Sequence, residues 1–153
     1  IRHDSEWHMS YSAKPPYEIL QNNLIDFAMM QRLKRFARYW DLLANSGHFI
    51  ETLPLLWQDR STFFEIRDLS DWLFGRSGQT HALALERLAE FLYLYLTEVR
   101  GFAKSDVQEK LVRDYQRGAL RRIPKFLGQH QVTPQRKKVP KAGARQAVHL
   151  GGQ

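Results

Sequence analysis

The sequence contains no cysteine. A disulfide, a thiolate nucleophile and a cysteine-ligated zinc or iron–sulfur centre are therefore excluded within this chain. No apolar run reaches the roughly 18 residues that are needed to cross a bilayer, and no signal-peptide pattern opens the chain. We therefore expect no membrane partner and predict a cytoplasmic location.

The sequence also lacks the common signatures of catalysis and metal binding. It has no glycine-rich phosphate loop, no nucleophile elbow and no Cys/His pair. Its six histidines are scattered, without an HExxH pair or another i, i+4 relation on a helix. Carboxylate pairs such as Asp68 with Asp71 fall on helix faces predicted to be exposed. We assign no catalytic residue, no cofactor-binding residue and no metal ligand to this chain.

The positive charge is concentrated at one end of the chain. The formal net charge is +7, of which residues 129–153 carry +5 with no Asp or Glu. The balance of +2 over residues 1–128 is ordinary for a globular surface. Because the tail is rich in Lys, Arg, Gln, Pro and Gly, it cannot bury enough apolar surface to offset its ordering entropy. We predict a disordered basic tail over 129–153.

Apolar residues recur at helical spacing from Leu24 onward. A first helix is predicted to run to about Ala44, where the residues up to Gly47 favour a stop. Further helices are predicted over 48–57, 62–78, 80–99 and 105–118, the third and the fifth with capping-box spacing at their starts. The 43% hydrophobic content of the 153 residues fits one domain. The predicted fold class is all-α, with a bundle of about five helices over residues 21–128.

The first 20 residues follow a different pattern. Residues 8–12 tend to alternate, and Pro15 with Pro16 forbids a continuous helix. This pattern predicts a short strand followed by an extended connector. Because the chain starts without Met, on residues typical of the middle of a strand, we expect a fragment of a longer protein.

The first helix has two predicted faces. A stripe expected to face the core includes Trp40, and Trp40→Ala is expected to cost about 3–5 kcal/mol. The stripe comprises Met29, Leu33, Phe36, Ala37, Trp40, Leu43 and Ala44. The basic residues Arg32, Lys34, Arg35 and Arg38 are most simply explained as a solvated face. Binding of phosphates or of an acidic partner domain is the functional alternative.

Two segments together resemble a known family. Pro-Pro-Tyr-Glu-Ile-Leu at 15–20 and Arg-Phe-Ala-Arg-Tyr-Trp-Asp-Leu-Leu-Ala-Asn-Ser-Gly at 35–47 are similar to the C-terminal helical region of cobalamin-binding radical SAM proteins. In that family a cobalamin-binding domain precedes a radical SAM barrel, and a helical domain of unknown function follows. The resemblance implies that residues 1–20 are the remnant of the end of the barrel, that 21–128 form the accessory domain, and that 129–153 lie outside the match.

The resemblance also implies cofactors for a parent enzyme, which would hold a 4Fe-4S cluster on a CxxxCxxC motif and bind S-adenosylmethionine and cobalamin. The cysteines of that motif are absent here. No cofactor contact of the family can therefore be placed on a residue of this chain, and any enzymatic activity belongs to the parent. The implied partners are the upstream radical SAM and cobalamin-binding domains of the same chain.

We therefore predict an accessory role, in which the helical domain packs on the barrel and shapes or shields its active site. The residues selected for the surface toward the other domains or a partner are Arg35, Arg38, Tyr39, Asn45 and His48. The alternative is a helical nucleic-acid-binding or adaptor module that uses the basic helix face and the tail. Because the charge outside the tail is nearly balanced, we do not expect nucleic acid as the partner.

Overall fold

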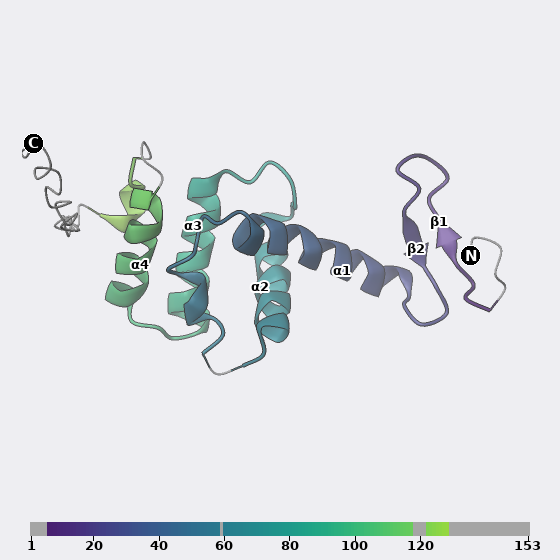
Figure 1. Ribbon diagram of the computed structural model, residues 1–153, viewed down its shortest axis with the longest axis horizontal. Helices are drawn as coiled ribbons and strands as arrows, with labels where there is room; N and C mark the ends of the chain where they lie inside the picture. The colour runs from purple at the N-terminus through teal and green to yellow at the C-terminus, as the bar shows by residue number, and fades with distance from the viewer. Residues whose placement is uncertain (1–5, 59, 118–121, 129–153) are drawn as a thin grey trace, which may run out of the picture.

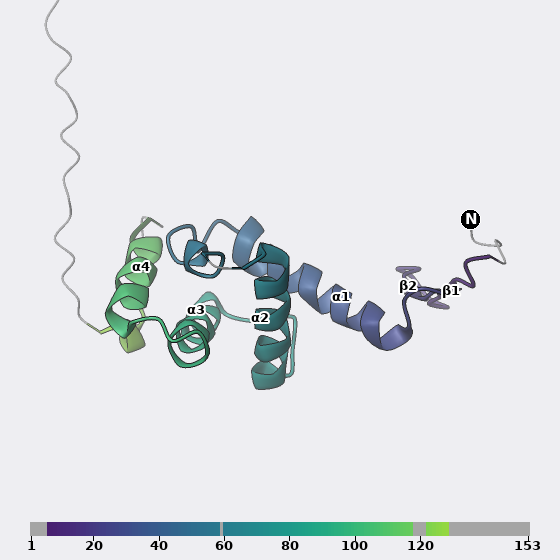
Figure 2. The same ribbon diagram turned by 90° about the horizontal axis from the view of Figure 1, so that it is seen from below.

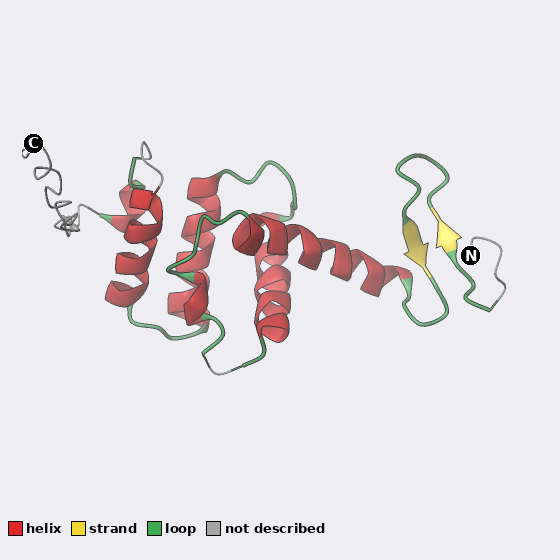
Figure 3. Ribbon diagram, viewed as in Figure 1, coloured by secondary structure: helices red, strands yellow, loops and turns green. Residues whose placement is uncertain are grey.

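The computed structural model describes residues 6–58, 60–117 and 122–128. This part of the chain is mostly helical, with a small two-stranded sheet near its N-terminus (Figures 1 and 3). The main elements are β1 (Ser10–Tyr11), β2 (Ile19–Gln21), α1 (Phe27–Trp40), α2 (Thr62–Ser77), α3 (Leu85–Leu94) and α4 (Lys104–Arg117). The predicted all-α class is confirmed, whereas the predicted disorder of 129–153 lies outside the described residues.

The helix α1 connects two parts of the molecule. Its C-terminal half packs across α2, while its N-terminal half extends away from the other helices to the β-hairpin (Figures 1 and 2). The helices α2, α3 and α4 follow one another away from α1, with α3 between α2 and α4. The strand β2 contacts α1, and Lys34 Nζ bonds the carboxylate of Glu18 at 2.6 Å.

The hairpin corrects the prediction of an extended connector. The strands β1 and β2 pair with each other in antiparallel orientation, with Tyr11 opposite Ile19. The segment after the first strand therefore turns back at Pro15 and Pro16, instead of running on in one direction. Prolines suit such a turn because they have a fixed φ and no N–H to place in a strand ladder.

Most predicted helix ends agree with the structure. The carboxylate of Asp26 caps α1 by accepting from Met29 N at 2.7 Å. A π-helical turn over Asp41–Asn45 continues α1, and Gly47 follows it with a φ of +68°. Another π-helical turn, Tyr95–Val99, continues α3. A positive φ is the conformation in which glycine is favoured over other residues, so Gly47 ends the first helix as the sequence predicted.

Three local predictions were wrong. The segment 48–57 forms only a short 3-10 helix, Leu53–Leu55, because Pro54 interrupts regular hydrogen bonding. The fourth helix begins at Leu85 and not at residue 80 or 81. Neither capping box is formed: Ser61 is the N-cap residue of α2 and Glu65 is engaged in ion pairs, while α4 begins at Lys104, so that Ser105 lies inside the helix.

The core is formed by the end of α1, the segment after it, one face each of α2, α3 and α4, and the 3-10 turn Lys125–Leu127. Its fully buried large side chains are Tyr39, Phe49, Leu43, Leu56, Ile66, Leu69, Leu73, Leu88, Leu92, Leu96, Leu111 and Leu127. None of the described helices is long and apolar enough to span a membrane.

The face that α1 turns to the core differs from the predicted stripe. Tyr39 and Leu43 are fully buried, whereas Trp40 is half-buried and Ala37 is exposed. The hydroxyl of Tyr39 donates to the carbonyl oxygen of Gln79 at 2.8 Å. The π-helical turn also contains more residues per turn than an α-helix, so counting at 3.6 residues across it misplaces the buried face.

Candidate functional site

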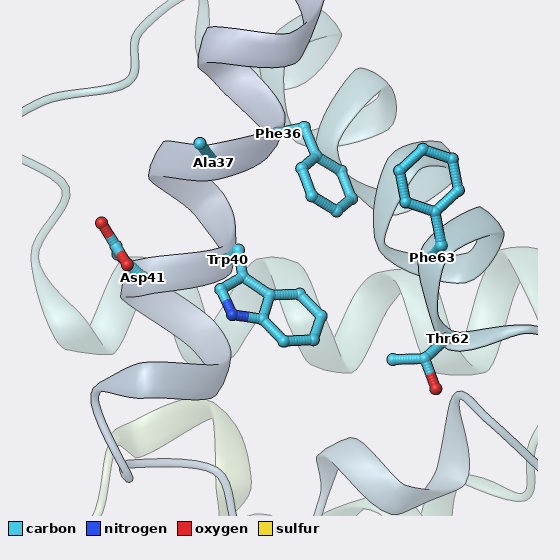
Figure 4. A pocket seen from close by; sticks show the side chains of 6 residues that line it. All are labelled: Phe36, Ala37, Trp40, Asp41, Thr62 and Phe63. Carbon is cyan, nitrogen blue, oxygen red and sulfur yellow. The ribbon is translucent and has the colours of Figure 1, made fainter.

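An apolar groove lies between α1 and the beginning of α2 (Figure 4). The rings of Phe36, Trp40 and Phe63 border the same space in the close-up view. Phe36 stacks on Trp40 with ring centroids 6.1 Å apart and lies 5.1 Å from Phe63. The hollow has a volume of about 360 Å³ and is lined by Phe36, Ala37, Trp40, Asp41, Thr62 and Phe63.

A second hollow extends the groove toward the N-terminus of α1. It has a volume of about 230 Å³ and shares Phe36 and Phe63 with the first. Its lining residues are Met29, Arg32, Leu33, Phe36, Phe63 and Arg67. We call the two hollows together the α1 groove. Exposed fractions of 44% for Met29 and 46% for Phe63 show that these large apolar side chains are open to solvent.

The two cationic side chains that line the α1 groove, Arg32 and Arg67, are paired with carboxylates. The guanidinium of Arg32 bonds Asp71, which raises the pKa of the arginine mainly through this hydrogen bond. Arg67 bonds the neighbouring Asp68 at 2.8 Å and lies over the ring of Phe64, 4.9 Å from its centroid. With these charges neutralised in pairs, the groove itself offers mainly apolar and aromatic surface.

Asn45 fixes the tryptophan at one end of the groove. Its side-chain oxygen accepts from Trp40 Nε1 at 3.1 Å, and its amide nitrogen donates to Asp41 Oδ1 at 2.6 Å. The indole therefore has a polar anchor on the π-helical turn and presents its apolar ring to the groove (Figure 4). Asn45 was selected from the sequence, and the structure gives it a positioning contact.

A second concave region lies on another flank of α1 and is basic. Its volume is about 430 Å³, and its lining residues are Glu18, Gln31, Lys34, Arg35, Ala37, Arg38, Thr80 and His81. We call it the basic cleft. The guanidinium of Arg35 lies 4.5 Å from the centroid of the Phe74 ring, and Arg38 Nε donates to Thr80 O at 3.3 Å.

The structure separates the five residues that were selected from the sequence. Arg35 and Arg38 line the basic cleft, and Asn45 lies at the end of the α1 groove. His48 is half-buried beyond the helix end, with its ring perpendicular to that of Phe49. The selection of Tyr39 for a surface was wrong, because its side chain is fully buried and its hydroxyl donates to the carbonyl oxygen of Gln79.

Sequence reasoning missed the contribution of α2 to the α1 groove. Phe63 and Phe64 stand side by side at the start of α2, and both are exposed. Adjacent positions on a helix are about 100° apart, so two successive phenylalanines cannot both point to one core. From this pair of phenylalanines, an exposed aromatic surface at the start of α2 could have been predicted. The wide apolar stripe of α1, which exceeds what one buried face needs, was another.

Among the residues that the structure describes, no three His, Asp or Glu side chains gather as metal ligands would. The comparisons with known proteins give one family. A family model described as "Protein of unknown function (DUF4080)" matches residues 5–149. Neither the curated proteins nor the solved structures include a match to the chain.

Proposed function

The chain belongs to this DUF4080 family of proteins of unknown function, and from that premise we propose that it is the C-terminal accessory region of a cobalamin-binding radical SAM enzyme. The segments at 15–20 and 35–47 support this proposal by their resemblance to that enzyme family. In this role the chain supplies no cofactor ligand of its own. It packs on the catalytic barrel and shapes or shields the active site from water.

The observation that carries the docking part of the proposal is the α1 groove. Monomeric soluble proteins seldom leave large contiguous apolar patches open to solvent, and such patches commonly mark contact surfaces. Here Phe36, Trp40 and Phe63 border one hollow, and Met29 extends the apolar surface. Because aromatic side chains and methionine are enriched at protein interfaces, the composition of the groove favours a protein partner. The proposed partner is the upstream part of the same polypeptide.

The α1 groove replaces the surface that was first selected from the sequence. Of the selected residues, Asn45 retains a place in the docking proposal because it orients Trp40. Tyr39 belongs to the core, and Arg35 with Arg38 faces a different concavity. Arg32 and Lys34 already pair with Asp71 and Glu18, so the basic helix face is smaller than its sequence suggests. We therefore do not propose the nucleic-acid alternative.

The identity of the parent enzyme is tested by the coding sequence upstream of Ile1. In the same reading frame, the proposal expects a CxxxCxxC motif within a radical SAM domain and a cobalamin-binding domain before it. A start codon directly before Ile1, or an upstream region without these cysteines, would contradict the proposal.

The docking surface is tested by variants of the longer protein. Phe36→Ser combined with Phe63→Ser removes two aromatic rings from the α1 groove. The control Val99→Ser changes an exposed apolar residue at the end of the π-helical turn that continues α3. We expect limited proteolysis to cleave before α1 faster in the groove variant only. Equal cleavage rates in the groove variant, the Val99 variant and the unmodified protein would contradict docking through the groove.

A further inference from the structure

We infer that the basic cleft binds the phosphate group of a small-molecule ligand, with Arg35 and Arg38 as its main donors. This inference goes beyond the proposed accessory role and does not rest on it. The α1 groove is apolar and fits a protein surface, whereas the basic cleft is lined mainly by cationic and polar side chains. Either assignment can fail without the other.

The first argument is the contrast between arginines within the described residues. Most of them have a carboxylate partner: Arg32, Arg60, Arg67, Arg76, Arg87, Arg100, Arg113 and Arg117. In the same part of the chain, no carboxylate lies within ion-pair distance of Arg35 or Arg38. These two residues are three positions apart on α1, so they neighbour each other on the helix surface. Two adjacent guanidinium groups without a counter-charge favour an anion.

The second argument is the position of the Arg35 guanidinium against an aromatic ring. Its guanidinium lies over the ring of Phe74, and its Nε is buried without a hydrogen-bond partner among the described residues. Stacking on an aromatic ring restrains the guanidinium plane, which reduces the entropy lost when a ligand binds.

The third argument is the chemistry of the cleft as a whole. Its volume of about 430 Å³ lies in the range of small-molecule sites. Glu18 is the one carboxylate among its lining residues, and Lys34 already bonds it at 2.6 Å. The hydroxyl of Thr80, the amide of Gln31 and the ring of His81 add further hydrogen-bonding groups.

These groups suit a phosphate better than a carboxylate. A phosphate monoester carries nearly two negative charges near neutral pH and three acceptor oxygens. Two arginine forks can therefore bond it at once, each in the bidentate geometry that guanidinium groups favour. A single carboxylate has one charge and two oxygens, which would leave one of the two arginines without a counter-charge.

The inference is tested with the 153-residue chain and inorganic phosphate as the probe. Binding is followed by the ³¹P line width at constant ionic strength, with acetate as the competing carboxylate. We expect saturable binding that acetate displaces poorly. In Arg35→Gln combined with Arg38→Gln, the affinity should fall about tenfold or more, because charge-assisted hydrogen bonds are lost.

The matched control is Arg113→Gln combined with Arg117→Gln, which removes the same charge from exposed, ion-paired positions on α4. This control should bind phosphate as the unmodified chain does. Circular dichroism checks the fold of each variant. If the cleft double variant does not fold, the single variant Arg38→Gln takes its place, because the Arg38 side chain is exposed.

Three results would overturn the inference. The unmodified chain could fail to bind phosphate. The cleft variant could keep its affinity, or lose no more than the α4 control, which would place binding on the basic tail or on the general surface. Acetate could displace phosphate at equal concentration, which would show that the cleft has no preference for phosphate.

Discussion

Where α2, α3 and α4 pack on one another, the leucines between them are fully buried, whereas beside the α1 groove Met29 of α1 and Phe63 of α2 remain exposed. The same contrast holds for charge. Glu65 on α2 is completely buried between Arg100 at 2.5 Å and Arg60 at 3.1 Å, while Arg35 on α1 has no carboxylate partner among the described residues. Folding alone accounts for the buried groups between α2, α3 and α4. For the open groups beside α1 we propose contacts with a protein partner and with a phosphate ligand.

The largest expected effect comes from breaking the buried charge cluster of α2. In Glu65→Ala, the cation of Arg100 remains half-buried without its partner, so the free energy of unfolding should fall by about 3–5 kcal/mol. Urea denaturation of the chain measures this loss. The control is Glu98→Ala, which removes an exposed carboxylate 3.9 Å from Arg76 and should cost about 0–1 kcal/mol. Similar losses of unfolding free energy in both variants would contradict the proposed difference between the buried and the exposed ion pair.

The next effect compares two nearby apolar positions, one at the end of α1 and one on the π-helical turn that continues it. Leu43 is fully buried, so Leu43→Ala should cost about 2–5 kcal/mol. Trp40 is half-buried beside the groove, and Trp40→Ala should cost only about 1–2 kcal/mol, because less buried area is lost. This value replaces the larger loss expected from the sequence. Urea denaturation that gives the larger loss to Trp40→Ala would restore the face predicted from periodicity.

A smaller effect tests the correction made for Tyr39. Tyr39→Phe keeps the buried ring but removes the hydroxyl that donates to Gln79 O, so it should cost about 1–2 kcal/mol. The control Tyr93→Phe removes a hydroxyl that has no hydrogen bond within the described residues, and it should cost less. Thermal unfolding of the two variants gives the comparison. If Tyr39→Phe unfolds at the same temperature as the unmodified chain, the hydrogen bond of the Tyr39 hydroxyl does not contribute to stability.

The smallest expected effect is a change in the free energy of unfolding with pH, caused by the Asp114 carboxylate on α4. Burial raises the pKa of Asp114, although this carboxylate accepts hydrogen bonds from the backbone of Glu51 and Thr52 and from the Thr52 hydroxyl. Because the folded state then holds the proton more tightly than the unfolded state, stability from this group decreases as the pH rises through the raised pKa. It is fully present only below the usual aspartate pKa of about 4.

The variant Asp114→Asn isolates this contribution. The difference in unfolding free energy between the unmodified chain and the variant should grow as the pH falls from neutral toward about 4. Urea denaturation at several pH values measures it. A difference that instead shrinks with falling pH would mean that the hydrogen bonds outweigh burial and lower the pKa.

Periodicity predicted where the helices lie but not which side of α1 faces the core. The apolar positions from Met29 to Ala44 form a stripe wide enough for both a buried face and an exposed groove, and hydrophobicity alone does not separate the two. The π-helical turn at Asp41–Asn45 then shifts the register within that stripe. Helix ends were more predictable, because Gly47 and Gly78 adopt a positive φ that the local sequence itself favours.

Contacts between residues far apart in the chain could not be predicted from the sequence. Glu65 has the spacing of a capping box, yet its carboxylate pairs with Arg100, 35 positions away in the chain. Phe63 of α2 completes a groove whose other aromatic members lie on α1, and His81 reaches the basic cleft from the loop before α3. Residue spacing within one helix carries no information on such pairs, since they depend on how whole helices pack.

The most direct test of the docking surface is hydroxyl-radical footprinting of Met29, Trp40 and Phe63, in the 153-residue chain and in the longer protein that includes the upstream domains. We predict rapid oxidation of all three in the shorter chain and strong protection in the longer one, with Val99 oxidised equally in both. Equal oxidation of the three groove residues in the two proteins would contradict the account, because the groove would then stay open to solvent beside its proposed partner.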